Sequence, residues 1–363
     1  MSGSTAPREP PAEGRDESGP TCLICGGDRW ARTLSARERQ FGLPGAFRYA
    51  QCARCDSLQL LDVPADLGAY YPAGYYSFDV APARGVGARL KGVRDRSAVT
   101  GHGTLGRLLA VVQPPPAAGL HRWLQLAGVG PDSRILDVGC GGGALLHTLA
   151  AAGYRDLTGV DPFLDGDRRA GIVRLLRRTV EALDETFDLV MMHHALEHVP
   201  DPAATVRALR ARCRSGAHCL VRVPIAPSAA FRRYGERWVQ LDAPRHLVIP
   251  SERGLIALAE RAGFALVSHR QDSTAIQWWG SALYAGDGLL SVDGARVGWV
   301  GRQRGRLRAW RARAVSRRIA VPKPRRRQRR GAGASRRSAT ITAVTTSIAA
   351  RCPWAISIGT SIS

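Results

Sequence analysis

Short apolar runs alternate with helical patterns through the middle of the chain. The runs typical of buried strands are residues 135–138, 157–162, 187–192, 218–224 and 264–269. Helical apolar spacing lies between them, and the last such helix is expected to begin after Ser251 as its N-cap and to end at Gly263. This alternation predicts an α/β fold built on a doubly wound, mostly parallel, Rossmann-like sheet.

The turn after the first of these strands is rich in glycine. Residues 134–144 read RILDVGCGGGA, in which an apolar strand breaks into glycines and continues as a helix. Glycine lets the backbone approach a ligand closely, and a helix N-terminus offers unpaired N–H groups. The spacing Gly139-x-Gly141-x-x-Ala144 also fits a dinucleotide fingerprint. Because glycine-rich turns also occur in α/β proteins without such a ligand, the segments that follow decide its role.

The next strand ends in an acidic residue, Asp161. It lies 24 positions after Asp137, near the roughly 20-residue offset at which an acid contacts ribose hydroxyls in nucleoside-binding βαβ units. Consecutive strands joined by a helix are expected to be parallel. Gly139 and Asp161 should therefore meet at the carboxyl edge of the sheet, where ligands bind.

Two C-x2-C pairs precede the predicted sheet. Cys22 and Cys25 form the first pair, Cys52 and Cys55 form the second, and 26 residues separate the pairs. Each pair places two thiolates on one tight turn, which is typical of a structural zinc site with four protein ligands about 2.3 Å from the metal. Two disulfides or four unrelated cysteines are the alternatives. Residues 47–51 alternate as a strand does and lead into the second pair.

Composition divides the chain into five segments. The expected segments are a disordered N-terminus (1–20), a zinc-binding module (21–60), a tyrosine-rich link with a helical connector (61–118), the sheet domain (119–293) and a basic tail (294–363). The tail is expected to be disordered or the product of a frameshift, because residues 340–363 show neither a helical nor a strand pattern. Half of the eight tyrosines lie in residues 70–76, where they could line a polar-substrate pocket or pack the module on the main domain.

The net charge of +22 is a property of the tail. Residues 301–363 hold 17 of the 52 basic residues and no acid follows Asp293, which leaves 35 basic against 30 acidic residues elsewhere. Nucleic acid is therefore a less favoured partner than a small molecule. Because the first twenty residues lack an apolar signal-peptide core and no run of about 18 apolar residues occurs, we expect a cytoplasmic protein without a membrane span.

Three segments together resemble the class I S-adenosylmethionine (SAM)-dependent methyltransferases. They are ILDVGCGGG (135–143), LTGVDP (157–162) and FDLVMMHHALEHVPDP (187–202), whose order and spacing match that family over about residues 120–269. The N-terminal cysteines narrow the resemblance to bacterial methyltransferases with a four-cysteine zinc module, several of which act on sugars. Residues 241–247 and 272–281 resemble segments of that subgroup less specifically.

The resemblance implies a set of functional residues. Gly139, Gly141 and the nearby backbone would cradle the methionine part of SAM, and Asp161 would hold the ribose hydroxyls. Residues 179–181 would lie along the adenine, and His193 with His194 would face the sulfonium or the acceptor. The predicted cofactor-binding set is Asp137, Gly139, Gly141, Asp161, Val180, Glu181 and His193, and the predicted metal ligands are Cys22, Cys25, Cys52 and Cys55.

Methyl transfer from a sulfonium is an in-line displacement, so the protein mainly supplies position and a dry site. An oxygen or carbon acceptor also needs a base, and histidine suits that role near neutral pH. His246, His194 and His193 are the catalytic candidates, and a histidine satisfied by local hydrogen bonds is the alternative interpretation of His246. Glu197 and His198 are expected to cap and orient the helix that follows them.

The predicted function is SAM-dependent O- or C-methylation of a small-molecule or sugar acceptor. The alternatives are an rRNA or tRNA methyltransferase that grips RNA with the zinc module and basic tail, and a cofactor-binding protein without catalysis. A nicotinamide dehydrogenase is less favoured still, because it leaves the segment LEHVPDP unexplained. The sequence does not define the acceptor, the methylated atom or the oligomeric state.

Overall fold

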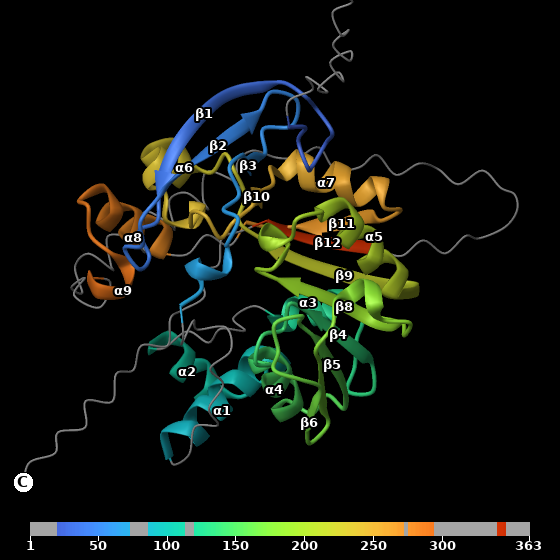
Figure 1. Cartoon of the computed structure of the whole chain (residues 1–363). Helices are drawn as coiled ribbons and strands as arrows, with labels where there is room; N and C mark the ends of the chain where they lie inside the picture. Colours follow the sequence, from blue (N-terminus) through green and yellow to red (C-terminus); the bar gives the residue numbers. More distant parts are fainter. Residues whose placement is uncertain (1–19, 73–85, 113–119, 272–274, 294–339, 346–363) are drawn as a thin grey trace, which may run out of the picture.

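A large mixed sheet forms the centre of the protein (Figure 1). The computed structural model describes residues 20–72, 86–112, 120–271, 275–293 and 340–345. The strand order is β11-β12-β9-β8-β4-β5-β7-β6, and every neighbouring pair is parallel except β6 with β7. The strands are β4 (Arg134–Val138), β5 (Asp156–Val160), β6 (Arg168–Ala170), β7 (Val173–Leu176), β8 (Phe187–His193), β9 (Cys213–Val223), β11 (Ala265–His269) and β12 (Thr340–Thr345). The predicted class, an α/β fold on a mostly parallel sheet, is confirmed.

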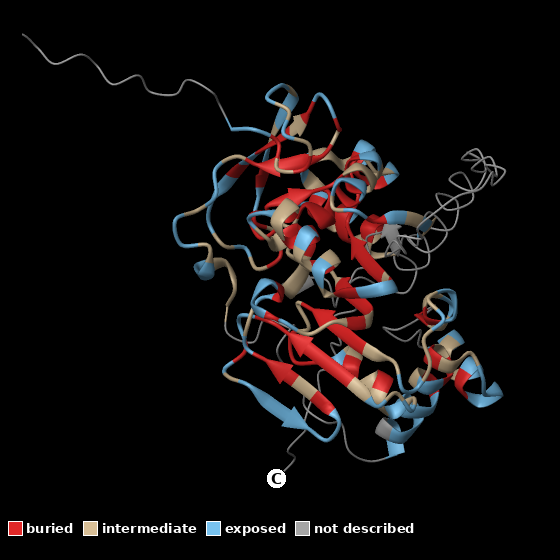
Figure 2. Ribbon diagram, turned by 90° about the vertical axis from the view of Figure 1, so that its right-hand side faces the viewer, coloured by how far each residue is buried: buried red, intermediate tan, exposed pale blue. Residues whose placement is uncertain are grey.

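Helices cover both faces of this sheet, as its apolar strands require. Leu136 and Val190 pack in one core with α5 (Pro202–Arg212) and α7 (Glu252–Arg261). Their chain neighbours Ile135 and Leu189 face the opposite core, with α3 (Leu120–Leu126) and α4 (Ala144–Ala151). Figure 2 shows most strands of the sheet coloured as buried, whereas the edge strand β6 is exposed. Because both of its faces are covered, a central strand such as β8 is mostly apolar rather than alternating.

The helix expected after Ser251 begins and ends where the sequence predicts. The Ser251 side chain accepts a hydrogen bond from the Gly254 N–H at the start of α7, and Gly263 follows the helix with φ of +86°. The connector forms α1 (Val86–Thr100) and α2 (Thr104–Val112), which pack against each other. In the described part of the chain, none of the helices combines the length and the apolar character needed to cross a membrane.

A second, antiparallel sheet joins the N-terminal segment to the rest of the chain. Its order is β1 (Trp30–Arg37), β2 (Ala46–Cys52), β3 (Leu58–Leu60) and β10 (Val248–Ile249). The fourth strand comes from the loop before α7, so the expected boundary near residue 60 cuts through a continuous sheet. Two helices lie near it, α6 (Ala229–Tyr234) and α8 (Ile276–Ala285), and the short α9 (Leu290–Asp293) follows.

Part of the tail belongs to the large sheet. Residues 340–345 form β12, which pairs in parallel with both β9 and β11. The expectation that residues 340–363 form no strand is therefore wrong for this stretch. Its sequence, TITAVT, is mostly β-branched and suits a strand without showing strict apolar–polar alternation. Residues 294–339 and 346–363, like the N-terminus expected to be disordered, lie outside the described residues.

Candidate functional site

The carboxyl ends of three central strands lie at one edge of the large sheet. Val138, the last residue of β4, pairs with Val160 of β5 on one side and with Met192 of β8 on the other. The residues that follow these strands are therefore neighbours. The structure thus brings together the glycine turn, Asp161 and the histidines after β8, as the sequence predicted.

The first glycine of the turn, Gly139, is packed too closely for a side chain. A Cβ atom on Gly139, where φ is +71°, would lie 2.4 Å from the Cβ of Ala195. Gly141, with φ of +51°, donates its N–H to Asp161 Oδ2 at 3.0 Å. Ala195 belongs to the turn after β8, so this contact seats that turn directly against the glycine loop.

Two acidic side chains are buried beside the turn. Asp161 accepts the N–H of Gly141 with one oxygen and that of Phe163 with the other, the latter at 3.0 Å. Asp137 is 3% exposed, and its Oδ1 has no hydrogen-bond partner among the described residues. Burial, together with the negative charge of Asp161, raises the pKa of Asp137 to about 8. Near pH 7 such a carboxyl group is mostly protonated, and a cationic ligand beside it would favour its ionised form.

The segment predicted to lie along the adenine forms a short 3-10 helix, η2 (Val180–Ala182). Val180 is buried in the core shared with α5. Glu181 is exposed, and its Oε1 accepts a hydrogen bond from Thr205 Oγ1 of α5 at 3.2 Å. The observed contact of Glu181 is therefore with α5, and its role toward a cofactor stays a prediction.

The two histidines at the end of β8 leave ring nitrogens without partners. His194 has φ of +51° and donates its backbone N–H to the Arg222 carbonyl at 2.8 Å. The Nε2 atoms of His193 and His194 are both buried without a hydrogen bond in the described part of the structure. Burial holds the pKa of His193 well below its ordinary value, and the positive charges of Arg222 and His194 lower it further.

Glu197 lies at the centre of a histidine cluster. It is in η3 (Leu196–His198), its side chain is 1% exposed, and neither carboxylate oxygen has a hydrogen-bond partner among the described residues. Its Oε1 lies 3.5 Å from His194 Nδ1 and 3.9 Å from His246 Nε2. Burial opposes ionisation, but the surrounding histidines hold the pKa of Glu197 below its ordinary value.

The expected capping role of Glu197 and His198 is wrong. Helix α5 begins at Pro202, and the Asp201 side chain caps it by accepting the Ala204 N–H at 2.8 Å. A capping side chain must directly precede the first helical residue, which is the position of Asp201. Glu197 and His198 lie four and three positions before Asp201, at the end of a separate turn. They are instead part of the site.

His198 and His246 are held by backbone carbonyls. His198 Nδ1 lies 2.9 Å from the Arg245 oxygen and His246 Nδ1 lies 2.8 Å from the Gln240 oxygen. A carbonyl can only accept, so each Nδ1 carries the proton and each Nε2 keeps its lone pair. The local hydrogen bond expected as the alternative for His246 is thus present. Burial, together with the charge of His198, lowers the pKa of His246 to about 4. His246 is therefore a weak base.

Two tyrosines of the tyrosine-rich link make different contacts, and lining a substrate pocket stays a prediction. The Tyr70 ring packs edge-on against Phe47 of β2, with 5.3 Å between centroids. The Tyr71 hydroxyl lies 3.3 Å from His198 Nδ1, at the border of the histidine cluster. The remaining tyrosines of this link, at 75 and 76, lie outside the described residues.

Arg245 positions the loop that carries His246. Its side chain is fully buried, with Nη2 lying 2.7 Å from Glu38 Oε1 and 2.6 Å from Asp242 Oδ1. Its Nη1 donates to the Tyr70 carbonyl at 3.0 Å. One guanidinium therefore ties together the loop after β1, the tyrosine link and residues 242–246. The sequence contains no periodic signal for this network, because its members are far apart in the chain.

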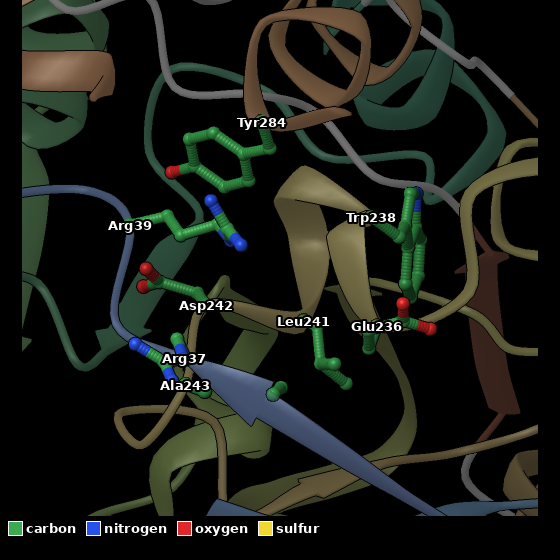
Figure 3. A pocket seen from close by; sticks show the side chains of 9 residues that line it. Arg37, Arg39, Glu236, Trp238, Leu241, Asp242, Ala243 and Tyr284 are labelled. Atoms are coloured by element: carbon green, nitrogen blue, oxygen red, sulfur yellow. The ribbon is translucent and has the colours of Figure 1, made fainter. Parts of the chain in front are cut away.

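A small hollow borders Asp242 (Figure 3). It lies between the end of β1, the segment before His246 and α8, and its polar lining residues are Arg37, Arg39, Glu236, Asp242 and Tyr284. The Tyr284 hydroxyl is buried and makes no hydrogen bond to the described residues. The lining carries charges of both signs, so the hollow is polar in character.

The four N-terminal cysteines converge as predicted. Sγ–Sγ distances are 3.6 Å between Cys22 and Cys55 and 3.5 Å between Cys25 and Cys52, and all four sulfurs lie within 4.8 Å of one another. All four are free thiols, so the disulfide alternative is not supported. A tetrahedron with metal–sulfur bonds of about 2.3 Å has edges of about 3.8 Å. The cluster therefore has the dimensions of a tetrahedral zinc site.

Comparison with known proteins agrees with this architecture. Residues 111–269 match the model of a family described as "Methyltransferase domain", and together with the sheet this match identifies a methyltransferase-like α/β domain. The ubiquinone biosynthesis O-methyltransferase of Bordetella avium is 37% identical over 164 residues, which are 39% of this chain and 66% of the relative. The enzyme of that name from Serratia proteamaculans is 37% identical over 111 residues, or 27% of this chain and 46% of the relative.

The chain thus spans less than two thirds of the length of these curated relatives. A solved SAM-dependent methyltransferase from Thermotoga maritima aligns at 21% identity with a TM-score of 0.31, over 40% of this chain and 75% of that one.

Proposed function

We propose that this protein is a SAM-dependent methyltransferase that acts on a hydroxyl oxygen of a small-molecule acceptor. The observation that carries the proposal is the pair of buried acids, Asp137 and Asp161, beside a glycine turn at the carboxyl edge of the sheet. SAM brings a cationic ammonium, a ribose with two hydroxyls and a methyl carbon on a positively charged sulfur. The names of the curated relatives favour oxygen over carbon as the methylated atom.

Each part of the site has a matching partner on that cofactor. Asp137 Oδ1, which has no hydrogen-bond partner among the described residues, would accept from the ammonium, and the methionine part would lie against the backbone of the glycine turn. Asp161 already accepts two backbone N–H groups, and each oxygen keeps a lone pair for a ribose hydroxyl. Val180 and Glu181 are retained as the proposed adenine neighbours.

Among the predicted catalytic histidines, we assign to His194 the role of the base that takes the proton from the acceptor hydroxyl. Its Nδ1 faces Glu197 Oε1 at 3.5 Å, and its Nε2 has no hydrogen-bond partner within the described ranges. His194 directly precedes Ala195, which packs on the glycine turn, so its place in the chain is close to the proposed cofactor position. Burial keeps His193 neutral, so we assign it to the lining of the site. His246 is too weak a base to take the proton.

A structural zinc ion at Cys22, Cys25, Cys52 and Cys55 completes the proposal. The sulfur positions fit a tetrahedron, and all four ligands come from the protein, which leaves no position for a substrate. Cys22 and Cys55 belong to the same apolar core as α7 and β8. The ion would therefore stabilise the junction between the two sheets rather than take part in methyl transfer.

Replacing Asp161 with Ala should weaken cofactor binding strongly. The change removes a charged acceptor of two hydroxyl hydrogen bonds, a loss on the order of 2–3 kcal/mol, or roughly 30- to 150-fold in Kd. Calorimetry with S-adenosylhomocysteine measures this directly. Asp184→Ala, at an exposed acid of the same domain, is the control and should bind as the unaltered protein does. Equal affinity in a folded Asp161→Ala variant would refute the ribose assignment.

Replacing His194 with Asn should remove methyl transfer while preserving cofactor binding. Asn tolerates the left-handed backbone at this position but cannot take up a proton, so the rate should fall about 10²- to 10⁴-fold. The measurement is transfer of labelled methyl from SAM to a panel of catechols, phenols and sugars. His102→Asn, at an exposed histidine, should retain full activity. A full rate in His194→Asn would contradict its assigned role, and failure of every acceptor would count against O-methylation.

A further inference from the structure

The histidine cluster contains more ligand atoms than methyl transfer by His194 requires. Within the described residues, Glu197, His198 and His246 each place a ligand atom within 4.8 Å of the others. They come from two separate segments, η3 and the loop before β10, that meet only in the folded chain. Glu197 is almost fully buried, and its two oxygens make no hydrogen bond to the described residues. A buried carboxylate without a hydrogen bond is costly unless a nearby positive charge compensates it, and the two histidines beside Glu197 are charged only when protonated.

We propose that Glu197, His198 and His246 bind a divalent transition-metal cation. Two imidazole nitrogens with one carboxylate form a ligand set that suits Zn²⁺ or Fe²⁺ better than Mg²⁺ or Ca²⁺, which prefer oxygen ligands alone. The compensating charge for Glu197 would then be the metal itself. This site is distinct in position and chemistry from the four cysteines.

The orientation of the two imidazoles supports this assignment. Each Nδ1–H donates to a backbone carbonyl, of Arg245 for His198 and of Gln240 for His246. Metal-binding histidines are typically held in this way, because the second hydrogen bond fixes the tautomer and the ring. The Nε2 lone pairs are left for a metal, and the ring centroids of His198 and His246 are only 4.7 Å apart. Local packing alone explains neither the matched tautomers nor a buried Glu197 carboxylate without a hydrogen bond.

The ligand count suggests what else this metal would hold. Three protein ligands leave at least one coordination position open, as in catalytic rather than structural metal sites. The acceptor of the proposed methyl transfer carries a hydroxyl oxygen, which is a suitable ligand for that position. This extension rests on the proposed function, whereas the binding of the cation does not.

Metal content of the purified full-length protein tests the proposal. After chelation and reloading separately with Zn²⁺, Fe²⁺ or Mn²⁺, mass spectrometric analysis of the unaltered chain should find one equivalent that Glu197→Gln and His246→Asn both lack. Loading with Co²⁺ should show visible bands of a nitrogen–oxygen site that disappear in the same variants, while any cysteine–cobalt charge-transfer band persists. Glu252→Gln is the matched control, because Glu252 pairs with His269 at 3.1 Å outside the cluster.

Two results would overturn the proposal. One is that folded Glu197→Gln, with an unchanged melting temperature, retains every equivalent bound by the unaltered protein. The other is that none of the three metals adds an equivalent beyond the cysteine site. Calorimetry with S-adenosylhomocysteine on the same samples separates this outcome from failure of the proposed function. Cofactor binding without the extra metal contradicts only the metal site, and metal without cofactor binding contradicts only the methyltransferase assignment.

Discussion

Ending the chain after Val300 is expected to destabilise the large sheet. The truncation removes β12, which lies between β9 and β11 and pairs with both in parallel. Without it, β11 loses its only neighbouring strand in the described sheet, and β9 becomes an unprotected edge. Each lost backbone hydrogen bond contributes roughly 1 kcal/mol, so the free energy of unfolding should fall by several kcal/mol. Differential scanning calorimetry should show a melting temperature lower by about 10 °C or more.

A second truncation provides the control for this experiment. A chain that ends after Thr345 keeps β12 and removes only residues beyond the described strand. It should melt within a few degrees of the full chain. If the chain ending at Val300 also melted at that temperature, residues 340–345 would contribute nothing to the sheet.

Replacing both Cys22 and Cys52 with Ser should cause the largest loss of stability. The two substitutions together remove one thiolate from each C-x2-C pair, so the four-ligand site proposed here cannot bind zinc tightly. Structural zinc contributes an apparent 10–16 kcal/mol in isolated zinc fingers, and this cluster is continuous with the core of the large sheet. We expect loss of one equivalent of zinc together with cooperative unfolding well below the melting temperature of the unaltered protein. Metal analysis and calorimetry on the same sample measure both.

Cys219→Ala is the matched control, because Cys219 is equally buried but lies on β9 away from the cluster. It should keep the zinc and lose only about 1–2 kcal/mol of stability. Full retention of zinc by the double variant would show that the four cysteines are not the ligands. Loss of zinc without loss of stability would show that the ion does not support the junction between the sheets.

The elements predicted correctly from sequence are those with a strong local signal. The strands β4, β5 and β8 are buried on both faces and read as continuous apolar runs, and the turn at Gly139 needs glycine because Ala195 is so close. Positions at the ends of these strands follow from the rule that parallel strands align. The meeting of the glycine turn and Asp161 at one edge of the sheet is therefore predictable without any long-range contact.

The parts missed from sequence depend on contacts between distant residues. β12 has a plausible strand composition, but nothing local indicates that it inserts between β9 and β11. The two-residue strand β10 is too short for a periodic pattern. From the sequence, Glu197 is expected to cap a helix because a helical segment follows it in the chain. In the structure it lies beside His246, which is 49 positions away. Such clusters form only when separate loops meet.

The antiparallel sheet also constrains the order in which the protein can be completed during synthesis. β1, β2 and β3 leave the ribosome early, but β10 lies almost two hundred residues later in the chain. During translation at about 5–20 residues per second, the edge of β3 must wait on the order of ten seconds or more for its partner. Throughout that interval the cysteines and an open sheet edge are exposed together. The first segment of this protein to be made is therefore finished only after the central strands of the large sheet have emerged.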